Sequence, residues 1–490
     1  MTPLIVLSVI AFYFVVLMFI SYRTSRNSGE NAFFDGDRKS PWFLVAFGMV
    51  GAVISGVTFV SIPGLVGNDA FHYFQFVMGN VVGYLFIAFV LVPLYYKLKL
   101  VSIYSFLDSR FGDTTYKTGS LFFILSQSFG AALRLLLAVK ILQYAFFDAF
   151  QIPIYVTTVI LLLLIWLYTH QSGIKTIVWT DALQTFFLLS AAVIAIFTIK
   201  SALQLTSPGL LSTITTHDYF IIFEWDSLAG SNFFKQFISG ALIAIAMMGL
   251  DQNMMQKTLT CKNVNEAKKN VLTFSLFLAL AQFLFLCLGV LLYVYAEANG
   301  IALAMDGGSF LDTDKLFPML SLEHFGLLAG IAFLLGIVAA SFSSADSALT
   351  ALTTSFCYDF LRIDQKPKAR RKPIKNIVLF GFNVLLFVIV MSFAGSKGAI
   401  ISLIFKVAGY TYGPLLGLYL LGMFSRIQLR DKWVPVVCIT AALSTYILNE
   451  VAINAFNFDF GFMNIFVNAL LTVLGLFFIK AKREVAESLS

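Results

Sequence analysis

The stretch that decides the fold is Gly48–Gly64, GMVGAVISGVTFVSIPG, an apolar membrane span that is interrupted by four glycines and a proline. Helix-breaking residues at membrane depth are tolerated where the freed backbone groups find partners in protein or line a hydrated cavity. Broken spans of this kind mark binding sites in secondary transporters. The alternative is a kinked packing helix whose small residues only allow close contact with its neighbours.

A second stretch, Ala339–Thr354, AASFSSADSALTALTT, is an apolar span with an aspartate among several hydroxyls. Helical spacing places Ser343 one turn from both Asp346 and Ser347, so the three side chains share a face. Hydroxyls with a single carboxylate supply hard oxygen ligands of low total charge, which suits a sodium ion. Calcium or magnesium would ask for more carboxylates, and zinc for His or Cys. The alternative is that the hydroxyls bond back to their own helix.

The composition is that of a polytopic helical membrane protein. Of 490 residues, 59% are hydrophobic and 12% charged, with a mean hydropathy of +0.87, which is far from the composition of a soluble globular protein. The four cysteines and four histidines are scattered, so neither a disulfide framework nor a metal cluster is indicated. No polar segment is long enough to form a soluble domain. We therefore expect one membrane domain, residues 1–490, without an organic cofactor or nucleic-acid partner.

At about 20 apolar residues per crossing, the chain divides into about thirteen transmembrane helices. The predicted spans are 3–22, 41–65, 71–96, 118–148, 152–169, 176–199, 233–250, 271–296, 324–356, 374–394, 399–424, 433–450 and 460–480. Most of the 33 basic residues fall in every second loop, Lys257 among them. This asymmetry predicts a multi-pass protein of the cell membrane with the N-terminus outside and the C-terminus in the cytoplasm.

Four ionisable residues lie within predicted spans, away from their ends: Arg134, Asp181, Asp346 and Lys406. Each costs about 2.5–3.5 kcal/mol on insertion scales, so such residues are functional candidates. The alternative is a buried network in which they pair with one another and bind nothing.

Four phrases together resemble the solute:sodium symporter family, whose members include sodium-coupled transporters of sugars, proline, pantothenate and sialic acid. They are GIKTIVWTDALQ (173–184), MGLDQNMMQKTLTCKNVNEAKKNV (248–271), AASFSSADSALTALTTSFCYDF (339–360) and GYTYGPLLGLYLLGMF (409–424). The resemblance implies a leucine-transporter-type fold of two inverted five-helix repeats, 41–200 and 233–424. The first helix of each repeat is broken. An extra helix and a cytoplasmic loop, 1–40, precede the repeats, and two extra helices, 433–480, follow them.

The resemblance also implies ion sites. By position in the family, a first sodium ion would bind carbonyls of Gly51, Ile54 and Ala340 and hydroxyls of Ser343 and Ser344. A second sodium ion, present in some members, would bind Asp181, Ser344, Asp346 and Ser347. Asp346 departs from the hydroxyl or small residue usual at its position, so it is either a sodium ligand or a structural counter-ion.

Substrate-binding candidates carried over by position are Ser55, Thr58, Tyr73, Val77, Asn80, Arg134 and Lys406. The phrase VTFVSIP and the position of Arg134 most resemble those of the sialic acid transporters. In those transporters the matching arginine holds the substrate carboxylate. A planar guanidinium suits a bidentate carboxylate. A neutral sugar or polyol is the alternative substrate. In that case Asp346 would neutralise Arg134 or Lys406 within the protein, and no solute carboxylate would be needed.

The resulting hypothesis is a sodium-coupled symporter that imports a small organic solute across the bilayer by alternating access around a midplane site. A membrane enzyme is not indicated, because no nucleophile elbow, metal motif or phosphate loop is present. A transporter-like sensor is not indicated either, because about ten residues follow Lys480. A passive channel is a further alternative.

Overall fold

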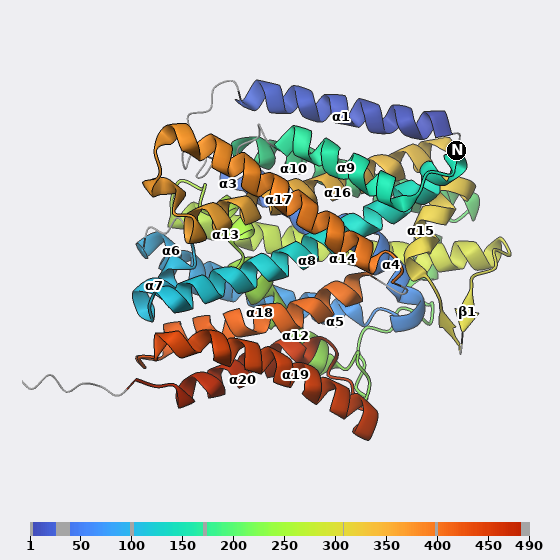
Figure 1. Cartoon of the computed structure of the whole chain (residues 1–490). Helices are drawn as coiled ribbons and strands as arrows, with labels where there is room; N and C mark the ends of the chain where they lie inside the picture. The colour runs from blue at the N-terminus through green and yellow to red at the C-terminus, as the bar shows by residue number, and fades with distance from the viewer. Residues whose placement is uncertain are drawn as a thin grey trace, which may run out of the picture.

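Long helices run roughly parallel across the molecule, with α1 at one side and α19 and α20 at the other (Figure 1). The computed structural model describes residues 3–25, 40–98, 102–169, 174–306, 308–396 and 400–481. The α-helices up to residue 202 are α1 (Pro3–Ser25), α3 (Trp42–Val53), α4 (Gly56–Asp69), α5 (Tyr73–Phe86), α6 (Val92–Leu98), α7 (Ser105–Arg110), α8 (Asp113–Ala145), α9 (Ile154–Thr169) and α10 (Ile174–Ala202).

The second part of the chain adds further α-helices. They are α11 (Ser207–Thr215), α12 (Phe233–Ala244), α13 (Gln252–Thr258), α14 (Val264–Ala298), α15 (Leu316–Met319), α16 (Gly326–Ser355), α17 (Lys368–Phe393), α18 (Ile400–Phe424), α19 (Val434–Phe456) and α20 (Asn464–Phe478). Short π-helical turns continue α5, α12, α15 and α16: η2 (Ile87–Leu91), η4 (Ile245–Gly249), η6 (Leu320–His324) and η7 (Phe356–Phe360).

The remaining short elements join the long helices. The 3-10 turns are η3 (Phe147–Phe150), η5 (Thr313–Lys315), η8 (Ile363–Gln365), η9 (Asp431–Trp433) and η10 (Gly461–Met463). Strands β1 (Met305–Asp306) and β2 (Ser309–Phe310) form a small antiparallel hairpin at one end of the bundle (Figure 1). The chain is otherwise helical in its described residues, in agreement with the predicted all-α class.

Within the described residues, 9 helices are long and apolar enough to cross a membrane, or 11 when each of two bent pairs counts as one span. Two shorter apolar helices, Ile5–Ile20 and Ile154–Leu167, coincide with two further predicted spans. The multi-pass helical character is therefore confirmed, whereas the number thirteen stays a prediction. The predicted loop between the first two spans falls largely on residues 26–39, which lie outside the described residues.

Two helices are broken in the middle of the bundle. The first break separates α3 from α4 at Ile54 and Ser55, with a bend of 60°. At this break the Ser55 amide bonds to the Val53 carbonyl (2.8 Å) and not to the Gly51 carbonyl, its partner in a continuous helix. The broken span indicated by the sequence is therefore present, and it leaves backbone carbonyls without helical amides.

The second break separates η4 from α13 at Leu250 and Asp251, with a bend of 71°. The span predicted for 233–250 was therefore too short. The chain continues as α13 after the bend, because the Asp251 carboxylate caps the new helix by accepting from the Met254 amide (3.2 Å). An aspartate at the N-cap, the residue just before the first helical position, is a strong helix start signal.

Small residues let α3 approach α10 closely. A methyl group at Gly51 would lie 2.2 Å from Thr185 Oγ1 and 2.9 Å from the Asp181 carbonyl. Only glycine allows this approach. It places the first helix break beside the segment that carries Asp181.

Candidate sodium and solute site

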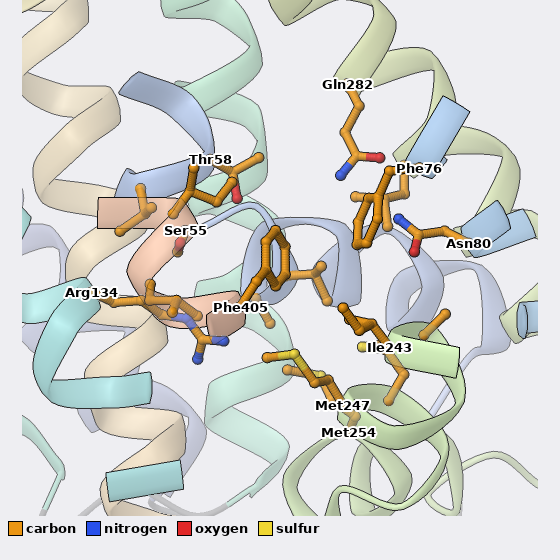
Figure 2. Close-up of a pocket in the computed structure, with 18 of the residues that line it drawn as sticks. Ser55, Thr58, Phe76, Asn80, Arg134, Ile243, Met247, Met254, Gln282 and Phe405 are labelled. Atoms are coloured by element: carbon orange, nitrogen blue, oxygen red, sulfur yellow. The ribbon is translucent and has the colours of Figure 1, made fainter. Parts of the chain in front are cut away.

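A cavity of about 90 Å³ lies between the two helix breaks. Its lining comes from the α3–α4 break, α5, α8, α12–α13, α14 and α18. Ser55 and Thr58 face it from the first break, Asn80 from α5, Gln282 from α14 and Arg134 from α8 (Figure 2). Segments that are far apart in sequence thus converge on one site near the middle of the bundle.

The first break packs directly against α16, the helix rich in hydroxyls. A methyl group at Gly56 would come within 3.1 Å of Ser341 Oγ and 2.8 Å of Ile337 Cδ1. Ala340, Ser343 and Ser344 occupy the next turn of the same helix and are buried. The structure therefore brings together the two elements that the sequence predicted for the first sodium site.

Ser344 is one of four α16 hydroxyls that are buried without a hydrogen-bond partner among the described residues, together with Thr350, Thr353 and Thr354. Ser341 Oγ donates to the Ile337 carbonyl of its own helix (2.6 Å), the arrangement usual for serine in a membrane helix. By contrast, Ser344 Oγ is buried and has no hydrogen-bond partner among the described residues. A buried hydroxyl without a partner is unfavourable, so Ser344 is available to a cation.

A buried ion pair connects α10, α13 and α16. Lys257 Nζ donates to Asp181 Oδ2 (2.7 Å) and to Ser347 Oγ (3.1 Å), and Lys257 and Asp181 are 1% and 0% exposed. Ser343 Oγ donates to the other oxygen of the Asp181 carboxylate (2.5 Å). The sequence assigned Lys257 to a loop between two spans, and this is wrong, because Lys257 is buried in the helix α13. The counter-ion of Asp181 is neither Arg134 nor Lys406.

Asp346 lies in the same region without such compensation. Its side chain is 0% exposed, and neither carboxylate oxygen has a hydrogen-bond partner among the described residues. Lys257 is already bonded to Asp181, so two carboxylates share one ammonium group. A buried carboxylate without a partner is strongly unfavourable. A cation beside the Asp346 carboxylate would remove this imbalance.

Arg134 supplies the charge of the central cavity. Among the described residues, its guanidinium makes no ion pair or hydrogen bond, and Figure 2 shows it on the side of the cavity that also holds Ser55. Asp251 attracts it electrostatically, but both Asp251 oxygens are engaged, one by the Met254 amide and the other by the Tyr412 hydroxyl (2.8 Å). The donors of Arg134 are therefore available to a solute.

The structure sorts the substrate-binding candidates into two groups. Ser55, Thr58, Tyr73, Asn80 and Arg134 line the cavity. The other two candidates lie outside it: Val77 is buried in the core without lining the cavity, and Lys406 is exposed on α18. A contact of Lys406 with the solute is a wrong expectation for this structure, because Ile401, Ile404 and Phe405 are the α18 residues that face inward.

Several functional residues were missed in the sequence. Asp251 and Lys257 are the two ionisable ends of the phrase DQNMMQK. Their spacing lets Asp251 cap a short helix while Lys257 reaches a neighbouring span. Gln282 sits alone in an apolar helix, which was a detectable signal. The apolar lining residues Phe76, Met247 and Met254 carried no signal, because most positions of these helices are apolar.

Comparison with known proteins agrees with this architecture. The model of the sodium:solute symporter family matches residues 33–428. The chain belongs to the sodium:solute symporter family. Proteins of this family are transporters and not enzymes, so the absence of catalytic motifs in the sequence was interpreted correctly.

Curated members of the family align with most of this chain at low identity. The sodium/iodide cotransporter of Homo sapiens is 23% identical over 412 residues, covering 82% of this chain. The chain spans 62% of the length of that cotransporter. The sodium/sialic acid symporter SiaT of Proteus mirabilis (strain HI4320) is 24% identical over 418 residues, covering 82% of this chain and 81% of SiaT.

Solved structures show the fold. A Na+-coupled sialic acid symporter in a substrate-bound outward-open state has a TM-score of 0.79 at 21% identity, covering 96% of both chains. The nucleobase-cation-symport-1 family transporter Mhp1, in a closed conformation, has a TM-score of 0.51 at 16% identity, covering 91% of this chain and 94% of Mhp1. The leucine-transporter-type fold class is thereby confirmed, whereas the repeat limits 41–200 and 233–424 stay predictions.

Proposed function

We propose that this family member is a sodium-coupled secondary active symporter that imports a small organic solute bearing a carboxylate. The observation that carries the proposal is the guanidinium of Arg134, which has no ion-pair or hydrogen-bond partner among the described residues and faces a cavity between two broken helices. Unpaired cations inside membrane proteins are costly, so a solute carboxylate is the natural partner of Arg134. Bidentate hydrogen bonding would add geometric specificity.

The first sodium ion would bind where the α3–α4 break meets α16. The carbonyl of Gly51 lacks its helical amide there, and Ser344 Oγ has no hydrogen-bond partner in the part of the chain that the structure describes. Ile54, Ala340 and Ser343 complete the proposed ligand set. Because these oxygens come from two helices, sodium binding would hold α3 against α16 and so favour the conformation that exposes the cavity to solute.

The second sodium ion would bind at Asp346 and Ser344. Lys257 already occupies the positions beside Asp181 and Ser347, so we propose that these two residues support the site without contacting sodium. The charges are consistent with one ion, since two carboxylates and one ammonium leave a single negative charge. A single sodium ion would therefore make the site electrically neutral.

The direction of transport follows from the proposed orientation. Figure 1 places the start of α1 at one end of the bundle and the end of α20 at the other. The distribution of basic residues puts the end of α20 in the cytoplasm. Sodium entering along its gradient would then carry the solute inward by alternating access around the central cavity.

Uptake by proteoliposomes tests the proposal. A carboxylate solute should accumulate against its gradient with sodium outside and should not accumulate when choline replaces sodium. Arg134→Gln should abolish accumulation, whereas Lys406→Gln, which removes an exposed cation on α18, should retain it. Sodium-independent equilibration of the solute would instead indicate a passive channel.

A further inference from the structure

The N-terminal helix α1 packs against α10 and α16 through one buried stripe (Figure 1). Val6, Tyr13 and Leu17 are at most 1% exposed, and their spacing places them on one face of the helix. Phe12 and Phe19 are 62% and 59% exposed on the remaining surface. Of the three buried residues, only Tyr13 carries a polar side-chain atom, and a buried tyrosine hydroxyl usually has a hydrogen-bond partner.

The partner of the Tyr13 hydroxyl is the side-chain amide of Gln184 on α10, which is 1% exposed. When the amide nitrogen faces acceptors, it lies 3.1 Å from Asp181 Oδ1, 3.0 Å from Ser343 Oγ and 3.3 Å from the Thr180 carbonyl. The amide oxygen then lies 3.2 Å from the Tyr13 hydroxyl, which donates to it. The reverse orientation would set the amide oxygen against a carboxylate oxygen and a carbonyl, which are also acceptors. The hydrogen bonds therefore select one orientation of Gln184.

This orientation matters for the Ser343 hydroxyl, which has one hydrogen to donate and two lone pairs. The hydrogen is donated to Asp181 Oδ1 (2.5 Å), and Gln184 donates to one lone pair. One lone pair is left for a cation, and the two neighbours fix its direction. Hydrogen bonds of this kind, made by the residues behind an ion ligand, orient the ligand and tune its affinity.

We propose that Tyr13 is a positioning residue of the first sodium site, because its hydroxyl holds Gln184 in the orientation that aims Ser343 at sodium. This inference rests on the proposed sodium symport and adds α1 to the helices that shape the ion site. The Tyr13 ring is held separately by Phe187 and Phe342, whose ring centroids lie 6.1 and 6.4 Å away. The hydroxyl can therefore be removed while the packing of the ring is kept.

Tyr13→Phe makes this change, and thermal stabilisation by sodium alone, in detergent, measures its effect. Choline replaces sodium to keep the ionic strength constant. The sodium concentration for half-maximal stabilisation should rise about three- to tenfold, the size expected for one lost hydrogen bond between neutral groups. Tyr419→Phe is the matched control, because Tyr419 is also buried and its hydroxyl donates to the Ile103 carbonyl (2.7 Å). The control should keep the wild-type sodium requirement.

A double variant tests whether the effect passes through Gln184. Gln184→Met keeps a side chain of similar length without the amide, so it should raise the sodium requirement at least as much as Tyr13→Phe. Adding Tyr13→Phe to Gln184→Met should then cause no further change, since the two residues act as one unit. A further three- to tenfold rise in the double variant would overturn positioning through Gln184.

The outcomes separate this inference from the function on which it rests. A wild-type sodium requirement in Tyr13→Phe would overturn the inference and leave sodium symport intact. A lower thermal midpoint in choline with an unchanged sodium requirement would also overturn it, because a purely structural role has that effect. If sodium does not stabilise even the wild type, the proposed sodium symport fails and the inference fails with it.

Discussion

Lys257 Nζ lies 2.7 Å from Asp181 Oδ2, and this ion pair joins α13, just beyond the second helix break, to α10. Both side chains are almost completely buried. The short helix α13 is thus held to the long helix α10 by one charge pair. The pair also leaves Asp346 as the uncompensated carboxylate of the region.

Lys257→Met should strongly destabilise the protein, by about 3–5 kcal/mol, because it leaves the Asp181 carboxylate buried without a partner. The double variant Lys257→Met/Asp181→Asn should recover much of this loss, since no uncompensated charge remains from the pair. Thermal unfolding in detergent measures both effects. Equal destabilisation of the single and double variants would contradict the pairing.

Ser344→Ala should raise the sodium concentration required for half-maximal uptake, because it removes a hydroxyl proposed to bind sodium at both sites. Ser341→Ala is the matched control, since its hydroxyl is already bonded to its own helix. Sodium titrations of uptake and of thermal stabilisation provide the measurements. A normal sodium dependence in Ser344→Ala, with normal expression, would falsify the ligand assignment.

Arg134→Lys should weaken the apparent affinity for the solute strongly, because the charge is kept but the planar fork is lost. Sodium-induced stabilisation should persist in this variant, since Arg134 is not a proposed sodium ligand. Comparison of solute affinity and sodium stabilisation in one preparation distinguishes substrate binding from a general folding defect. Full transport by Arg134→Gln would be incompatible with carboxylate recognition.

Asp346→Asn should remove the voltage dependence of uptake. With two sodium ions and a monovalent anion, each cycle moves one net positive charge, which is worth about 2.3 kcal/mol per 100 mV. Uptake by the wild type should therefore rise at inside-negative potential, with a sodium Hill coefficient above one. In Asp346→Asn the coefficient should fall toward one. Voltage-independent uptake by the wild type would instead make Asp346 a structural counter-ion.

Asp314, in the turn before α15, predicts a pH effect on stability. Burial raises the pKa of the Asp314 carboxyl to about 6, although the Ile400 amide donates to it (2.9 Å). The folded protein therefore keeps a proton on Asp314 that the unfolded chain releases at lower pH. The stabilisation is present below about pH 4 and is lost as the pH rises through about 6.

The corresponding measurement is the thermal midpoint at pH 5 and pH 7. The wild type should lose more stability between these values than Asp314→Asn, by about 1.4 kcal/mol, because only about one pH unit of this interval lies below the folded pKa of about 6. Asp312→Asn, at the neighbouring exposed position that pairs with Lys315, should retain the wild-type difference. A wild-type pH response in Asp314→Asn would contradict the assignment.

Hydrophobic runs and helix breakers made much of the fold predictable. Membrane spans are local features, because every backbone polar group in lipid must be satisfied within its own helix. Gly51 and Gly56, which flank the break at Ile54 and Ser55, indicated it for the same reason, whereas Pro63 lies inside α4. The hydroxyl face of α16 was also visible, since helical spacing alone places Ser343, Asp346 and Ser347 together.

The partners of the charged residues could not be predicted in the same way. Lys257 looked like one more basic residue of a cytoplasmic loop, and only the 71° bend at Asp251 carries it back into the bundle. Lys406 and Phe405 are adjacent in sequence, yet one is exposed and the other lines the cavity. The rotation of α18 about its axis decides this, and it depends on packing against other helices.

The sequence by itself determined the membrane class, the first helix break and the residue types able to bind sodium and a carboxylate, because these follow from local hydrophobicity, backbone chemistry and helical period. Only the tertiary structure decided that Lys257 compensates Asp181, that Asp346 has no hydrogen-bond partner among the described residues and that Arg134 faces the central cavity. Charge compensation and cavity shape depend on contacts between distant helices, and such contacts leave no periodic signal in one sequence.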